Sequence, residues 1–142
     1  MIIDGNTFAA ACDAGVERVC FASYACVYPI NLQDKPDKNN ALVSLTEEMA
    51  DPLVPGRAYP DREYGWAKLM GELTQRAYYK QHGIKGVSWR LFTAYGDREN
   101  ETHAVIALIA KAFVRMNPYL IWGSGEQDRN FTHVDDIVRE CY

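Results

Sequence analysis

The sequence lacks the features that mark membrane, secreted and nucleic-acid-binding proteins. None of its apolar runs approaches the about 20 residues of a membrane span, and its first residues carry neither the basic nor the apolar region of a signal peptide. The net charge is −4, and no stretch gathers a run of basic residues. These absences predict a cytoplasmic protein of one domain's length that binds neither membranes nor nucleic acids.

Cysteine and histidine are too few and too scattered for a disulfide framework or a metal site. The four cysteines are Cys12, Cys20, Cys26 and Cys141, and none forms a C-x-x-C pair. Reduced, buried thiols are therefore expected in a cytosolic chain. The three histidines lie far apart in the sequence, so no metal site is predicted.

A glycine-rich turn of the kind that binds a dinucleotide is also missing. No G-x-G-x-x-G or G-x-x-G-x-x-G follows a predicted strand, and that turn holds a cofactor pyrophosphate at a helix N-terminus. Gly123-Ser124-Gly125 does not replace it, because no strand–turn–helix unit surrounds it. These residues therefore supply no such turn for a dinucleotide.

What the sequence does contain is an alternation of helices and apolar strands, which predicts an α/β layer architecture. Asn6 or Thr7 can cap a short helix that stops near Gly15. The apolar run at 16–23 predicts a strand buried on both faces. A second strand is predicted at 87–92, parallel to the first because a helix lies between them.

The intervening helix is predicted over 63–81 and closed by Gly83. One side of it carries an apolar stripe, made of Trp66, Leu69, Met70, Leu73 and Ala77. Later elements are a helix over 102–116, a short strand over 119–122 and a last helix from 134. The proline-rich tract at 30–62 is predicted to be a partly ordered lid with one helical turn at 47–49, since such long loops are usually lids or disordered.

The long helix also carries Tyr64 and Lys68, which lie four residues apart and therefore one turn from each other. An ammonium near a phenol favours the phenolate, so Lys68 is expected to lower the pKa of Tyr64 from about 10. Such a tyrosine can give and take a proton near neutral pH. Taken alone, the pair is equally consistent with an exposed lysine beside a half-buried tyrosine.

Four segments together carry a resemblance to a known family. They are Ser-Tyr-Ala-Cys-Val-Tyr-Pro at 23–29, Tyr-x-x-x-Lys at 64–68, Arg-Leu-Phe-Thr-Ala-Tyr-Gly at 90–96, and the stretch from Gly-Ser-Gly to Asp-Asp at 123–136. In this order the chain resembles the extended short-chain dehydrogenase/reductase family, in particular its NAD-dependent nucleotide-sugar epimerases and dehydratases. The resemblance implies the C-terminal part of a Rossmann-like parallel sheet with flanking helices, without the N-terminal glycine-rich βαβ units. On this resemblance, residues 1–142 are expected to form one partial domain, and residues 118–142 are the start of its substrate-binding part.

The resemblance also assigns catalytic and cofactor-binding roles. Tyr64 would take a proton from a sugar hydroxyl while hydride leaves the adjacent carbon for NAD, and Lys68 would hold the nicotinamide ribose. Asn6 would line the cofactor side. Ser23 would orient the substrate hydroxyl. Cys26 matches an acid/base cysteine of the similar GDP-mannose epimerases, which favours an epimerase; alternatively it is a small buried side chain.

On the substrate side, the resemblance places Thr93 and Arg129. Arg129 would grip the nucleotide diphosphate, for which a guanidinium is well shaped; alternatively it is a surface arginine. Tyr24 stands where the family has a hydrogen-bonding serine or threonine, so it either presents its own hydroxyl or obstructs the sugar. Ser23 cannot simply replace it, because successive residues of a strand face opposite sides.

Two functions remain open at this point. The first is an NAD-dependent nucleotide-sugar epimerase or dehydratase that is weakly active or inactive as this chain alone. The second is a non-catalytic truncated module that binds a nucleotide sugar or a partner subunit; an incomplete reading frame would look the same. In either case the resemblance implies a homo-oligomer through the helices at 6–14 and 64–81, or through the unpaired edge of the strand at 16–23.

Overall fold

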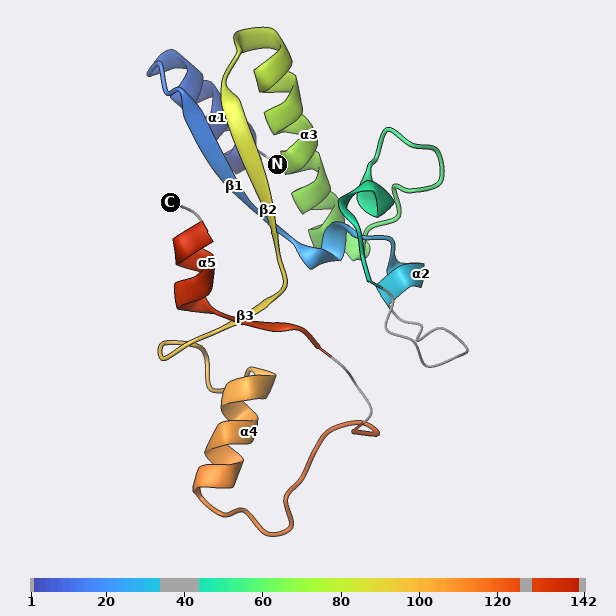
Figure 1. Ribbon diagram of the computed structural model, residues 1–142, viewed down its shortest axis with the longest axis vertical. Coiled ribbons are helices and arrows are strands. Elements are labelled where there is room, and N and C mark those ends of the chain that lie inside the picture. Colours follow the sequence, from blue (N-terminus) through green and yellow to red (C-terminus); the bar gives the residue numbers. More distant parts are fainter. Residues whose placement is uncertain (1, 34–43, 126–128, 141–142) are drawn as a thin grey trace. The chain divides into compact units, whose positions relative to one another are not determined.

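The computed structural model describes residues 2–33, 44–125 and 129–140. The chain divides into two compact units, Met1–Leu91 and Phe92–Tyr142, which are taken separately below. The first unit contains α1 (Ile2–Asp13), β1 (Arg18–Tyr24), the 3-10 turn η1 (Ala25–Val27), α2 (Ile30–Gln33), the 3-10 turn η2 (Glu47–Ala50), α3 (Arg62–His82) and β2 (Lys85–Leu91), as Figure 1 shows.

The two strands of the first unit form a parallel pair, in register from Arg18 opposite Lys85 to Tyr24 opposite Leu91. The predicted parallel arrangement is confirmed, because α3 provides the crossover that parallel strands need. One face of this pair is covered by helices: the ring of Phe21 lies 6.1 Å from that of Phe8 in α1 and packs against α3 at Gly71.

The opposite face of the pair is open among the described residues of this unit. Cys20, Ala22 and Val87 are exposed there. The prediction of a strand buried on both faces is therefore wrong for this unit. Burial alternates along β1, from exposed Cys20 to buried Ser23, as expected for a strand with one covered face.

Helix α3 buries a more polar side than its sequence predicts. Its buried residues include Glu72 and Gln75, whereas Trp66 and Met70 of the predicted apolar stripe are 45% and 39% exposed. The strands supply partners for the buried amide, because Gln75 Nε2 donates to the carbonyl oxygen of Val19 at 2.9 Å. A buried polar group with its partners in place can replace an apolar contact.

Glycines close both long helices of this unit, as predicted. Gly15 has a φ of +67°, its amide donates to the carbonyl of Cys12, and the next amide donates to the carbonyl of Ala11, which is the Schellman pattern. Gly83 ends α3 in the left-handed region. The predicted start of the first helix is wrong, because α1 begins at Ile2 and both Asn6 and Thr7 lie inside it.

The tract at 30–62 is ordered in part. Its predicted helical turn is present as η2, and α2 occupies its first residues. Residues 34–43 lie outside the described part of the chain. The role of this tract as a lid stays a prediction.

The second unit holds β3 (Thr93–Tyr95), α4 (Ala104–Phe113), β4 (Phe131–His133) and α5 (Val134–Glu140). β3 and β4 pair in parallel. The predicted strand at 119–122 is wrong, since no strand forms there. The carbonyl of Leu120 instead accepts a hydrogen bond from the ammonium of Lys111, and the Tyr119 hydroxyl donates to the carbonyl of Leu108 in α4. No helix among the described residues could span a membrane.

The close approach of α3 to η1 gives a stability prediction. A Cβ on Gly65 would lie 2.5 Å from the carbonyl oxygen of Cys26, whereas a Cβ on Gly5 in α1 meets nothing within 4 Å. Gly65→Ala should lower the free energy of unfolding by about 1–3 kcal/mol through overpacking, and Gly5→Ala should raise it by about 0.5–1 kcal/mol. Urea denaturation measures both, and equal effects of the two substitutions would contradict the close packing.

Candidate active site

Four of the predicted site residues come together where β1 ends and α3 begins. Tyr24 ends β1, Cys26 lies in η1, and Tyr64 and Lys68 occupy the first turns of α3. The amide of Asp61, just before α3, donates to the carbonyl of Cys26 at 2.8 Å. This hydrogen bond and the bare Cα of Gly65 bring the helix against η1. The carboxyl ends of parallel strands are a common place for ligand sites.

Two phenol rings lie next to each other in this cluster. The ring of Tyr24 meets that of Tyr64 edge to face, with centroids 5.9 Å apart and planes at 66°, a favoured geometry for aromatic pairs. Tyr64 is 57% exposed, so a ligand can reach it from outside. Tyr24 is half-buried.

The ammonium of Lys68 lies between the end of β1 and the Tyr64 ring. It donates to the carbonyl oxygen of Ala22 at 2.6 Å. It also lies 5.7 Å from the centroid of the Tyr64 ring and 5.4 Å from that of Phe21, within the range of cation–π contacts. Lys68 therefore faces the ring of Tyr64 and is held by the backbone of β1.

The pKa of Tyr64 is raised, and the predicted lowering by Lys68 is wrong for this arrangement. Partial burial is the main cause, followed by the nearby ionisable groups of Cys26 and Tyr24. The ammonium that should favour the phenolate is bound to the carbonyl of Ala22. Tyr64 is consequently a neutral phenol at neutral pH, and it is a weaker acid than an unperturbed tyrosine.

Cys26 is buried, and burial raises the pKa of its thiol, with the carboxylate of Asp61 acting in the same direction. Lys68 lowers this pKa to a smaller extent. The side chain is therefore a neutral thiol. Cys12, Cys20 and Cys26 are free, but only Cys26 is buried, so the predicted burial of the thiols is wrong for Cys12 and Cys20. Cys141 lies outside the described residues.

Ser23 points away from this cluster into the helix-covered side of β1. It is buried, and its hydroxyl donates to Glu72 Oε1 at 2.6 Å. The same carboxylate binds Arg90 of β2. The hydroxyl of Ser23 is thus used by the core. The sequence reasoning missed Glu72 and Arg90, although Glu72 follows Tyr64 and Lys68 at the same four-residue spacing.

The remaining predicted site residues lie elsewhere. Asn6 is exposed in the middle of α1. Thr93 is a half-buried residue of β3, and Arg129 is an exposed residue just before β4; both belong to the second unit.

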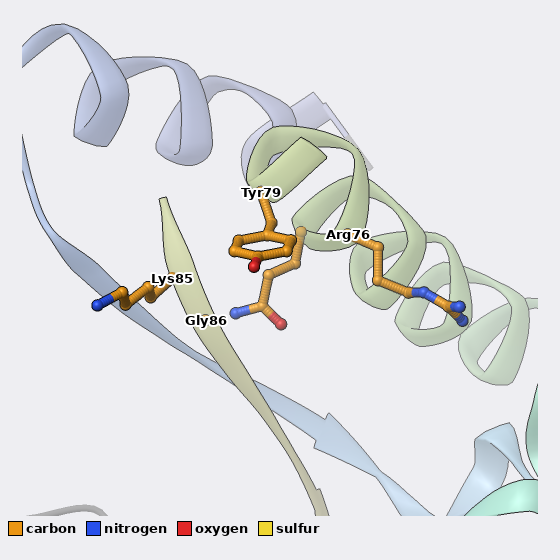
Figure 2. A pocket seen from close by; sticks show the side chains of 5 residues that line it. Arg76, Tyr79, Lys85 and Gly86 are labelled. Carbon is orange, nitrogen blue, oxygen red and sulfur yellow. The ribbon is translucent and has the colours of Figure 1, made fainter. Parts of the chain in front are cut away.

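A cavity of about 290 Å³ lies along the second half of α3 and contains none of the predicted site residues. In Figure 2 the side chains of Arg76 and Lys85 point in opposite directions, so the two cations do not converge on one point. The cavity is also lined by Gln75, Tyr79 and Gly86. Among the described residues, no group of three or more potential ligand side chains could hold a metal ion.

Comparison with known proteins gives consistent matches. The profile of the "NAD dependent epimerase/dehydratase family" matches residues 3–142. The chain is 31% identical to a GDP-L-fucose synthase of Sinorhizobium fredii, over 96% of the chain and 42% of that protein. It is 34% identical to GDP-mannose 3,5-epimerase 1 of Oryza sativa subsp. japonica, over 96% of the chain and 35% of that protein.

A solved structure shows the same fold. The UDP-glucuronic acid 4-epimerase of Bacillus cereus, in complex with UDP-glucuronic acid and NAD, superposes with a TM-score of 0.74 at 26% identity, over 99% of the chain and 39% of that structure. The chain spans about two fifths of the length of these relatives.

The direction of the Tyr64 pKa can be measured in the isolated chain. We expect the phenol to titrate above the about 10 of an unperturbed tyrosine, because burial and Cys26 favour its neutral form. Tyrosine Cζ chemical shifts followed against pH give the value, with Tyr64→Phe to assign the signal and Cys26→Ser expected to bring it closer to 10. A pKa below 10 would mean that Lys68 dominates.

Proposed function

Because the chain belongs to the NAD-dependent epimerase/dehydratase family, we propose that it acts on a nucleotide sugar by proton transfer at Tyr64 coupled to hydride transfer at a sugar carbon. The observation that carries the proposal is the cluster at the end of β1, where an exposed phenol lies over a backbone-held ammonium. Tyr64 is the group that exchanges a proton with the sugar hydroxyl. Its raised pKa keeps the phenol protonated until it meets the substrate.

The residues of this cluster fit one end of NAD, which supplies the hydride-accepting nicotinamide when it is bound. Lys68 and Tyr64 together offer an ammonium and a phenol that can bind vicinal ribose hydroxyls, and Lys68 would exchange its bond to Ala22 for them. The glycine turn that binds a pyrophosphate is not among these 142 residues. Asn6, an exposed residue of α1, is assigned to the cofactor side by the family resemblance alone.

The substrate-binding roles are assigned to Tyr24, Thr93 and Arg129. Tyr24 presents its hydroxyl to the sugar beside Tyr64, in place of Ser23, whose hydroxyl is engaged by Glu72. Cys26, kept as a neutral thiol, is a second proton donor, which favours an epimerase over a dehydratase. Thr93 and Arg129 contact the sugar and the diphosphate, with 118–142 as the start of the substrate-binding part and 30–62 as the lid.

The test compares two tyrosines of equal exposure. The chain is incubated with NAD and UDP-glucose, UDP-glucuronic acid or GDP-mannose, and products are followed by chromatography. Tyr64→Phe should lower any conversion by about 10²–10⁴-fold, and Tyr59→Phe should leave it unchanged, since Tyr64 and Tyr59 are 57% and 58% exposed. The free energy of unfolding of both variants should lie within about 0.5 kcal/mol of that of the parent chain. Conversion that survives in Tyr64→Phe would contradict the proposal.

A second candidate function is a non-catalytic module that binds a nucleotide sugar. It is supported by the exposed phenol of Tyr64 beside the ammonium of Lys68, a pair that can bind a ligand without reacting with it. Calorimetric titration separates the two candidates. A module binds the nucleotide sugar but not NAD at micromolar concentration and converts nothing, whereas micromolar NAD binding favours the enzyme.

We also propose that the chain pairs with a second copy of itself through α1 and α3. Trp66 and Met70 form an exposed apolar stripe on α3, whose opposite side is already satisfied by the strands. Ile2 and Ile3 are exposed at the start of α1. Large apolar side chains exposed on both helices are candidates for contact sites between proteins.

The oligomeric state tests this pairing. The double variant Trp66→Glu/Met70→Glu should shift the chain from dimer to monomer in sedimentation velocity, because each contact would bury a charge. Leu53→Glu is the control, since Leu53 is exposed but lies outside both helices. A parent chain that stays monomeric at high micromolar concentration would contradict the proposal.

A further inference from the structure

Arg90 of β2 links the buried side of α3 to β1. Its Nε donates to Glu72 Oε1 at 3.0 Å, and its Nη2 donates to Glu72 Oε2 at 2.8 Å, which is the two-bond fork of an arginine–carboxylate pair. Ser23 donates to the same carboxylate from β1. The side chains of Arg90 and Glu72 are only 16% and 8% exposed.

The same guanidinium also holds a loop. Arg90 Nη1 donates to the carbonyl of Glu47 at 2.9 Å, and Nη2 reaches the carbonyl of Ala50 at 3.4 Å. Ala50 is buried, and the guanidinium lies 5.2 Å from the centroid of the Tyr28 ring. The side chain of Arg90 therefore binds two backbone carbonyls of η2. Residues 44–61, which contain η2, are called the η2 segment below.

The η2 segment runs directly into the candidate site. Its last residue, Asp61, donates its amide to the carbonyl of Cys26, and Pro60 lies against Gly65 at the start of α3. Ser23, which donates to the same carboxylate of Glu72 from β1, is followed directly by Tyr24. Ser23, Glu72 and Arg90 thus connect β1, α3 and β2 with the η2 segment, which reaches η1 through Asp61.

Only an arginine can make this set of contacts. A guanidinium has five donors in one plane, whereas an ammonium is a point charge that cannot serve a carboxylate fork and two carbonyls at once. Burial acts to lower the pKa of Arg90, but the hydrogen bonds and charge of Glu72 outweigh it and raise that pKa. The guanidinium therefore stays charged beside the carboxylate of Glu72.

We propose that Arg90 is a positioning residue of the candidate site: its fork on Glu72 and its bonds to Glu47 and Ala50 hold the η2 segment against η1, and so keep Cys26 covered beside Tyr64. This inference rests on the proposed function for the meaning of the site. The contact itself is independent of any substrate or cofactor, so it is tested without either.

The first test is hydrogen exchange in the triple variant Ser23→Ala/Glu72→Met/Arg90→Met. Replacing a buried ion pair by apolar side chains of similar size is often neutral for stability, so this variant keeps the core and loses only the donors to η2. The amides of Asp51 and Asp61 should exchange at least about tenfold faster, while that of Val16 behind α1 stays unchanged. Equal acceleration at all three amides would show a general loss of stability and overturn the proposal.

The control cuts another tether of the same segment. Arg76 forms an exposed ion pair with Asp51 at 3.2 Å, and exposed pairs contribute little. Arg76→Met should change exchange at Asp61 by less than about twofold. A change as large as in the triple variant would mean that removing any contact of the segment frees it, so that Arg90 has no special role.

The second test uses the thiol of Cys26 as a reporter. In a chain with Cys12→Ser, Cys20→Ser and Cys141→Ser, iodoacetamide reacts with Cys26 only when its cover opens. The rate should rise about tenfold when Arg90→Lys is added, because lysine keeps the charge but loses the fork, with the melting temperature recorded alongside. An unchanged rate in a folded Arg90→Lys chain would overturn the proposal. Neither test needs turnover, so loss of the proposed function would leave both results standing.

Discussion

The structure of the first unit depends on the polar side of α3. Glu72 and Gln75 are buried against the strands, and both must find partners there, because an unpaired buried polar group costs about 1–3 kcal/mol. Gln75 bonds to the carbonyls of Val19 and Val87, one on each strand. Glu72 bonds to side chains of both strands. These directional contacts fix the height of α3 along the sheet, which apolar packing alone does with less precision.

That fixed height determines what the candidate site can do. Lys68 lies one turn before Glu72, so its ammonium is set at the carbonyl of Ala22, and Tyr64 comes level with Tyr24. The result is a cluster of neutral acids, a phenol and a thiol whose pKa values are both raised. Both groups are therefore protonated at neutral pH, and their raised pKa values make them weaker acids than an unperturbed tyrosine and cysteine.

The sequence was sufficient for the elements whose signals are local. The parallel strands, the glycine ends of the helices, η2 and the final helix follow from spacing, φ requirements and capping, and the family follows from four ordered motifs. The side of α3 that is buried could not be predicted this way, because Trp66 and Met70 look like core until Gln75 is seen with its partners on the strands. The prediction of a strand at 119–122 was wrong for a related reason, because a strand needs a partner strand and no local pattern shows whether one is present. The pKa of Tyr64 depended on where Lys68 finds an acceptor, which spacing does not reveal.

The buried cluster around Arg90 also limits how this chain can change over evolutionary time. Glu72 and Arg90 satisfy each other, so replacing either one alone leaves a charge without its partner, and a tolerated change has to alter both positions together. Gln75 and Ser88 are joined by a neutral hydrogen bond, which is a weaker constraint of the same kind. Trp66 and Met70, which are exposed in a single chain, are free to drift among large apolar residues one at a time. On the polar side of α3, tolerated substitutions are therefore expected in pairs. On its apolar side they are expected one position at a time.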